Sequence, residues 1–171
     1  YKGLELWHGT LGLIGFGRIA REVAKRAKAF DMDVIFYDPF IEEENLDGAR
    51  KVTLDELCSQ STFISLHIPH NDQTHYILDK EQFDMMKDNV IIVNCARGGT
   101  INESALLDAI EAGKVFCAGV DVFENEPSTA ENCPLISHDR VIATPHIGAG
   151  SKGASARVGA EVADIIVDFF K

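Results

Sequence analysis

Short apolar runs rich in β-branched residues alternate with stretches of helical periodicity, and this alternation constrains the fold more than any other feature of the chain. It predicts strands at 10–14, 34–37, 62–66, 90–93, 116–120 and 141–143, with helices at 18–30 and 102–112 among them. The run Val90–Val93 is apolar on both faces, which is typical of a strand covered by helices on both sides. We therefore predict an α/β fold built on a doubly wound parallel sheet.

The length and hydrophobic content of the chain predict one domain spanning residues 1–171. Its 171 residues, 46% of them hydrophobic, are enough for one substantial core. Residues 151–171 are predicted to form one closing helix whose apolar face must be covered by other residues. The two longest irregular stretches, 38–52 and 121–139, each follow the carboxyl end of a strand, where ligands of such sheets bind.

The charge balance excludes several classes of partner. A net charge of -11, from 16 basic and 27 acidic residues, would repel nucleic acid and anionic membrane surfaces. The apolar runs are too short to cross a bilayer, and the four cysteines contain no CxxC pair, so we expect a protein of the reducing cytoplasm. An anionic ligand must then be held by backbone N–H groups and a few selected cations.

A glycine-rich turn follows the first predicted strand. Gly15 and Gly17 begin the sequence GFGRIA, which fits the pattern G-x-G-x-x-G/A with Ala20 in its third position. The first glycine permits the tight turn, and the second lets a pyrophosphate approach the backbone. The N–H groups of Arg18 and Ile19 would then meet the phosphates. This context predicts a Rossmann-type dinucleotide site, although the motif alone also fits an ordinary βα turn.

Asp38 closes the second predicted strand, 21 residues after Gly17. A Rossmann fingerprint requires a carboxylate there to bind the adenine ribose hydroxyls. Three glutamates at 42–44 follow it, and no basic residue occurs before Arg50. Because these charges would repel a 2′-phosphate, we predict that NAD is preferred to NADP.

Three segments in the second half end predicted strands with polar residues: 94–99 (NCARGG), 119–127 (GVDVFENEP) and 144–149 (TPHIGA). In this order behind the glycine turn, they resemble the D-isomer-specific 2-hydroxyacid dehydrogenases, and the resemblance covers nearly the whole chain. It implies that Arg97 holds the substrate carboxylate and carbonyl, that His146 is the acid/base, and that Glu126 is the partner of that histidine. A carboxylate on one ring nitrogen fixes the tautomer of a histidine and favours its protonated form.

The resemblance also implies the cofactor contacts. It places Asp121 at the nicotinamide carboxamide and Ile68 and Pro69 beside the adenosine and ribose. The residues that line the nicotinamide pocket would be Cys95, Ala96, Ile147, Gly148 and Ala149, next to Arg97 and His146. Considered apart from its motif, each polar residue here is more often a solvated surface group.

Some features depart from this family. Thr100 and Asn102 stand where an aliphatic residue and Asp are more frequent, and neither position is catalytic. Family members are longer and have a separate substrate-binding domain that this chain lacks, so we expect it to bind NAD with little or no turnover alone. His70 and His75 do not form a convincing metal site, and we predict none.

Other functions remain compatible with these residues. C-terminal binding protein corepressors share the fold and the Arg, Glu and His set, so a dinucleotide-sensing interaction protein is an alternative. A relative acting on formate or phosphite is another. The leading prediction is an NAD-dependent oxidoreductase domain for a D-2-hydroxy acid or its 2-keto form, and the resemblance implies a homodimer.

Overall fold

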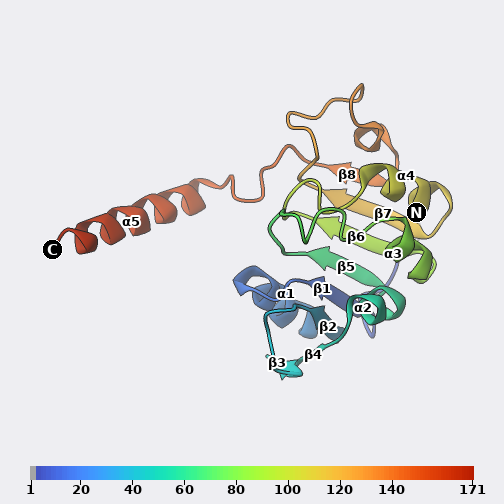
Figure 1. The fold of residues 1–171 in the computed structure, drawn as a ribbon, viewed down its shortest axis with the longest axis horizontal. Helices are drawn as coiled ribbons and strands as arrows, with labels where there is room; N and C mark the ends of the chain where they lie inside the picture. Colours follow the sequence, from blue (N-terminus) through green and yellow to red (C-terminus); the bar gives the residue numbers. More distant parts are fainter. Residues whose placement is uncertain (1–2) are drawn as a thin grey trace.

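The computed structural model describes residues 3–171 and contains one eight-stranded sheet (Figure 1). Its strand order is β3-β4-β2-β1-β5-β6-β7-β8, and every neighbouring pair is parallel except β3 and β4. The strands are β1 (Thr10–Ile14), β2 (Asp33–Tyr37), β3 (Asn45–Leu46), β4 (Ala49–Lys51), β5 (Phe63–Leu66), β6 (Val90–Asn94), β7 (Val115–Val120) and β8 (Val141–Ala143).

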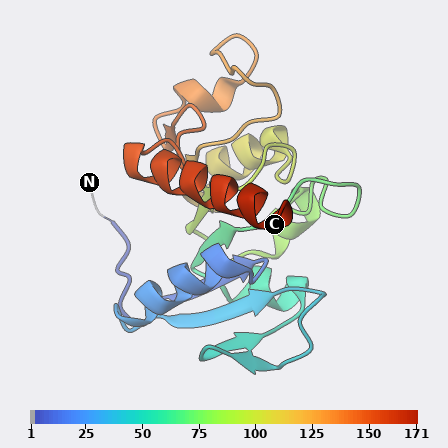
Figure 2. The ribbon, with the colours of Figure 1, turned by 90° about the vertical axis from the view of Figure 1, so that its left-hand side faces the viewer.

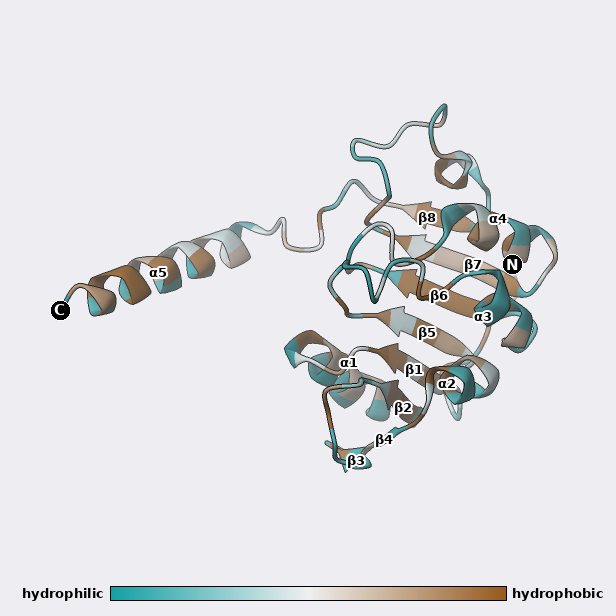
Figure 3. Ribbon diagram, in the orientation of Figure 1, coloured by the Kyte–Doolittle hydropathy of each residue, from teal (hydrophilic) through white to brown (hydrophobic). Residues whose placement is uncertain are grey.

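Helices cover both faces of this sheet, which confirms the doubly wound α/β prediction. One hydrophobic cluster joins α1 (Arg18–Lys28) to one face through small side chains such as Ala20 and Ala24. A larger cluster joins the opposite face to α2 (Leu54–Gln60), α3 (Lys80–Met85) and α4 (Glu103–Glu111). Figure 3 shows the strands between these layers as mostly hydrophobic.

The chain reverses its direction of travel across the sheet between β1 and β5. From β1 it runs outward through β2 to β4, and it then returns to β5 and continues outward on the other side to β8. All seven parallel strands end at the same edge. The carboxyl ends of β1 and β5, between which the chain reverses, are where open sheets of this type bind ligands.

Two short helices and one β-hairpin lie in segments for which we predicted no regular structure. Both α2 and α3 begin with a capping box, made by Thr53 with Glu56 and by Asp79 with Gln82. Because they span only 7 and 6 residues, neither has room for a clear helical period. The irregular stretch 38–52 contains β3 and β4, while 121–139 contains the 3₁₀ helix η1 (Pro134–Ser137).

The closing helix forms as predicted, over Lys152–Phe169 (α5), but extends away from the sheet (Figure 1), so that it lies in front of the other elements when viewed from that side (Figure 2). None of its residues is buried, and Phe169 is 81% exposed. The prediction that its apolar face is covered is therefore not met within residues 3–171. In that same part of the chain, no helix combines the length and hydropathy needed to cross a membrane.

Candidate functional site

The predicted glycine turn follows β1 at the point where the chain reverses between β1 and β5. Gly15 has φ +85°, and a Cβ atom built there would lie 2.7 Å from the carbonyl oxygen of His67. Gly17 caps α1 without a side-chain hydrogen bond, and a Cβ atom on it would meet open space. The first N–H groups of α1, at Arg18 and Ile19, have no partner within the helix, and both residues are exposed.

Asp38 reaches this turn from the end of β2. Its Oδ2 atom accepts a hydrogen bond of 2.9 Å from the N–H of Phe16, and Oδ1 accepts one of 2.9 Å from the N–H of Phe40. The structure also shows a feature that the sequence prediction did not consider. Arg50 and Lys51, on β4, line the same 660 Å³ cavity as Asp38. Their side chains donate to Gln60 and to the carbonyl of Ile41, respectively.

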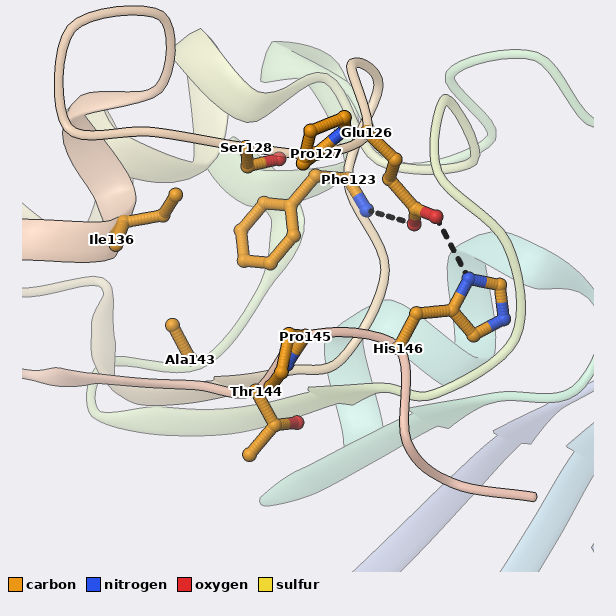
Figure 4. Close-up of a pocket in the computed structure, with 9 residues that line it drawn as sticks. All are labelled: Phe123, Glu126, Pro127, Ser128, Ile136, Ala143, Thr144, Pro145 and His146. Carbon is orange, nitrogen blue, oxygen red and sulfur yellow. Dashed lines mark hydrogen bonds and ion pairs between the residues drawn. The ribbon is translucent and has the colours of Figure 1, made fainter. Parts of the chain in front are cut away.

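Glu126 and His146 form a hydrogen-bonded pair, drawn in Figure 4. The distance from Oε2 of Glu126 to Nδ1 of His146 is 2.8 Å, while Oε1 accepts a bond of 3.2 Å from the N–H of Phe123. These two contacts, that with His146 first, lower the pKa of Glu126. The carboxylate is thus anionic near neutral pH, and Nε2 of His146 remains available for proton transfer.

Asp121 holds the loop that carries His146. Its carboxylate, only 4% exposed, accepts hydrogen bonds from the hydroxyl of Thr144 and from the N–H groups of Ile147 and Gly148. Burial raises the pKa of Asp121, but these three bonds outweigh burial and leave its pKa below the ordinary value. The backbone of His146, at φ +54°, donates to the carbonyl of Asp121 over 2.8 Å.

Arg97 lies on a turn built by a buried amide. The side chain of Asn94, 2% exposed, accepts from the N–H of Ala96 and donates to the carbonyl of Arg97 and to Thr100. Nη1 of Arg97 donates to the carbonyl of Ala96 over 2.6 Å. The side chain of Arg97 is exposed, and within the described range it makes no hydrogen bond to Glu126 or His146.

The other predicted contact residues occupy the same edge of the sheet. Ile68 packs against Gly15, and the carbonyl of Pro69 accepts the hydroxyl of Thr74. Cys95 and Ala149 are exposed. Burial raises the pKa of the Cys95 thiol above its ordinary value, so this exposed cysteine is largely a neutral thiol.

A cavity of about 530 Å³ lies beside the Glu126–His146 pair (Figure 4). The ring of Phe123 forms one wall, and Pro145 and Ile136 contribute to others. The sequence analysis did not predict it, because its walls come from the 121–139 stretch and from residues 143–146 at the end of β8, which meet only in the tertiary structure.

Comparison with known proteins identifies the family of this chain. Residues 1–148 match the family model described as the NAD-binding domain of the D-isomer specific 2-hydroxyacid dehydrogenases. The chain belongs to this family. Its Rossmann-type fold and NAD as its cofactor are thereby confirmed.

Two similar proteins are named as a reductase and a dehydrogenase. The chain is 54% identical to hydroxypyruvate reductase of Thermotoga maritima, over 96% of this chain and 54% of that protein. It is 47% identical to D-3-phosphoglycerate dehydrogenase of Methanocaldococcus jannaschii, over 97% of this chain and 32% of that protein. The chain therefore spans about half or less of the length of these relatives.

A solved structure of similar fold contains the family cofactor. D-lactate dehydrogenase of Aquifex aeolicus, complexed with NAD and lactic acid, matches with a TM-score of 0.88 and 34% identity, covering 99% of this chain and 55% of that one. In the present family member, the open space at Gly17 and the uncapped start of α1 fit a pyrophosphate, and the carboxylate of Asp38 beside that turn fits a ribose.

Three residues that support the site were missed by sequence analysis: Asn94, Thr144 and Phe123. All three lie in the motif segments, but no local pattern reveals their roles, because their partners lie on other loops or depend on a particular turn. Within residues 3–171, no three potential metal ligands gather. His70 and His75 contact each other, with 3.1 Å between their ring nitrogens.

Proposed function

We propose that this domain is the cofactor-binding part of an NAD-dependent oxidoreductase that interconverts a D-2-hydroxy acid and the corresponding 2-keto acid. When bound, the nicotinamide supplies or accepts the hydride at C2. His146 donates a proton from Nε2 to the C2 oxygen during reduction and removes it during oxidation. Arg97 binds the substrate carboxylate, for which its planar guanidinium is suited once it leaves the carbonyl of Ala96.

The Glu126–His146 pair is the observation that carries this proposal. Because Glu126 occupies Nδ1, the tautomer and the orientation of the imidazole are set before substrate arrives. Both residues lie at the carboxyl edge of the sheet, where the glycine turn also lies. A hydride acceptor and a proton acceptor on one edge are the two requirements of alcohol oxidation.

The relatives favour a small 2-keto acid as substrate. Hydroxypyruvate reductase is named for such a compound, and D-lactate dehydrogenase is complexed with a 2-hydroxy acid. Formate is the second candidate, because an NAD-dependent formate dehydrogenase of Staphylococcus aureus matches with a TM-score of 0.88 and 34% identity. The Glu126–His146 pair favours the 2-hydroxy acid reaction, because formate oxidation releases no hydroxyl proton for a base to accept.

We further propose that the 171-residue chain alone binds NAD but turns over slowly. His146 and Arg97 are exposed on this domain, so water has free access to the reacting groups. Turnover of a 2-keto acid by the isolated chain at a rate comparable to that of a full-length relative would refute this.

A chimera tests the reaction directly. This chain replaces the matching half of the Thermotoga maritima hydroxypyruvate reductase. NADH oxidation is followed with hydroxypyruvate, glyoxylate and pyruvate, and NAD reduction is followed with formate. We expect activity with a 2-keto acid that falls by roughly 10²- to 10⁴-fold in His146→Asn. Glu131→Gln, on an exposed glutamate of the 121–139 stretch, is the matched control. A folded chimera that binds NADH but reduces none of the three 2-keto acids refutes the proposal.

Cofactor preference is tested on the chain itself by titration with NADH and NADPH. We expect tighter binding of NADH, with the preference lost in Asp38→Asn because a carboxylate repels the 2′-phosphate. Tighter binding of NADPH by the parent chain would contradict this, and would indicate that Arg50 and Lys51 can release their present partners and bind that phosphate.

We also propose a cytoplasmic homodimer. Exposed apolar side chains on α5, including Ile165 and Phe169, provide surface for association, and all four cysteines are free, as in a reducing compartment. Sedimentation equilibrium tests the dimer, and a monomer at all accessible concentrations would exclude it for this chain.

A further inference from the structure

Two glutamates from separate elements cap each other's backbone beside the site. The N–H of Glu124 donates to Oε1 of Glu103 over 2.7 Å, and the N–H of Glu103 donates to Oε1 of Glu124 over 3.3 Å. Glu103 is the first residue of α4, whereas Glu124 lies in the loop after β7. The exchange joins the start of α4 to the loop that carries Glu126, across 21 residues of sequence.

The remaining oxygens of this pair are also used. Oε2 of Glu124 accepts the hydroxyl of Tyr76 at 3.1 Å, and Oε2 of Glu103 accepts the thiol of Cys133 at 3.2 Å. All four carboxylate oxygens therefore accept one hydrogen bond each, which compensates for bringing two negative charges together. Burial and then the bond to Glu103 raise the pKa of Cys133 to about 11, so this thiol keeps its proton as a donor.

The backbone next to this pair contacts both Glu126 and the turn that follows Arg97. Phe123, immediately before Glu124, donates its N–H to Glu126. On the other side, a Cβ atom on Gly98 would lie 1.9 Å from the carbonyl oxygen of Phe123, so the turn after Arg97 is packed directly against this backbone. One peptide segment thus lies between the Arg97 turn and the Glu126 carboxylate.

We infer that Glu103 and Glu124 are positioning residues that place Glu126, and through it His146, against the Arg97 turn. They act through the backbone of Phe123 and contact no reacting atom. The catalytic consequence rests on the proposed function, whereas the placement of Glu126 does not. We call the reciprocal Glu103–Glu124 contact the clamp. Loss of the clamp should loosen the hydrogen bond from Phe123 to Glu126, so that water competes for the Glu126 carboxylate.

The test is an NMR titration of the Glu126 carboxyl carbon, together with observation of the His146 Nδ1 proton, in the 171-residue chain. In Glu124→Ala we expect the pKa of Glu126 to rise toward its ordinary value, with about a threefold change in its ionisation constant, because the Phe123 amide no longer donates steadily. Glu124→Gln should restore the parent titration, since an amide oxygen still accepts from Glu103. Glu131→Ala is the control and should leave it unchanged.

A purely structural role predicts a different result. If Glu124→Ala lowers the melting temperature while the Glu126 titration and the His146 proton signal stay as in the parent, the inference is overturned. If Glu124→Ala does not fold, Glu124→Asp takes its place, because it keeps the charge but is one methylene too short to reach the N–H of Glu103. A parent-like Glu126 titration in the folded Asp variant also overturns the inference.

These readouts do not depend on turnover. An altered Glu126 titration together with an inactive chimera would support the clamp and refute the dehydrogenase proposal. An unaltered titration with an active chimera would refute the clamp alone. In an active chimera, Glu124→Ala should lower kcat more than it raises KM and shift the pH profile, while Glu124→Gln should remain near the parent.

Discussion

Replacing Asp121 by Asn tests whether this buried carboxylate holds the loop that presents His146. The parent carboxylate accepts three hydrogen bonds with two oxygens, from Thr144, Ile147 and Gly148. Asparagine has one acceptor oxygen, and its NH₂ group would face an N–H or a hydroxyl that also donates. At least one bond to a charged group is lost, and the others become neutral.

The magnitude follows from these contacts. A hydrogen bond to a charged group contributes about 1.5–3 kcal/mol, so we expect Asp121→Asn to destabilise the closed loop by about 2–3 kcal/mol. Because residues 144–150 are mostly exposed, the loss should appear as local opening before global unfolding. An energy of this size corresponds to roughly a 30- to 150-fold increase in the opening equilibrium.

Amide hydrogen exchange measures that opening. Exchange at Ile147 and Gly148 should accelerate by this factor in Asp121→Asn, while amides of the buried strand β7 serve as an internal reference. Asp139→Asn, at an exposed aspartate, is the matched control. If exchange at both loop amides stays within about threefold of the parent, the carboxylate does not hold the loop and the reasoning is refuted.

Three further predictions concern stability and reactivity. Burial lowers the pKa of His67 from 6.5 to about 4. As the pH falls, His67 is therefore protonated in the unfolded chain before it is protonated in the folded chain, and the free energy of unfolding should drop by about 2 kcal/mol between pH 7 and pH 5. In urea unfolding, His67→Gln should lack this pH dependence. A free energy of unfolding that varies with pH as in the parent would contradict the prediction. Gly98→Ala should destabilise the chain by about 2 kcal/mol or more in the same assay, because its Cβ would overlap the carbonyl of Phe123, and a parent-like value would contradict this. Alkylation at pH 8, followed by mass spectrometry, should modify exposed Cys95 before buried Cys58, because burial raises the pKa of Cys58 to about 12. Added NAD should protect Cys95, and faster labelling of Cys58 would be inconsistent with the fold.

Much of the fold was predictable because its signals are local. Most of the longer strands contain a short apolar run, and the glycine turn directly follows one of them. The helices α2 and α3 also carry local signals, since Thr53 with Glu56 and Asp79 with Gln82 fit the capping-box spacing. They were missed because a search for helical periodicity does not detect a helix of two turns.

In the functional site, too, local motifs predicted some features and the tertiary structure added others. Arg97, Glu126 and His146 were recognised by their motifs, and the structure joins the last two through a hydrogen bond. It leaves the Arg97 side chain on the carbonyl of Ala96. The prediction that Asp121 binds the carboxamide remains a prediction, and the structure adds a role that the motif did not indicate, as the anchor of the 144–148 loop.

The amino-acid sequence alone determined the order of most strands and of the helices α1, α4 and α5, the glycine turn and the residue types of the Glu126–His146 pair, because each depends on neighbours a few positions away. Only the tertiary structure decided which loops meet: Gly98 against Phe123, Glu103 against Glu124, and Arg50 beside Asp38. Such contacts join residues far apart in the chain. Their geometry depends on how the strands pair and twist, which no local pattern encodes.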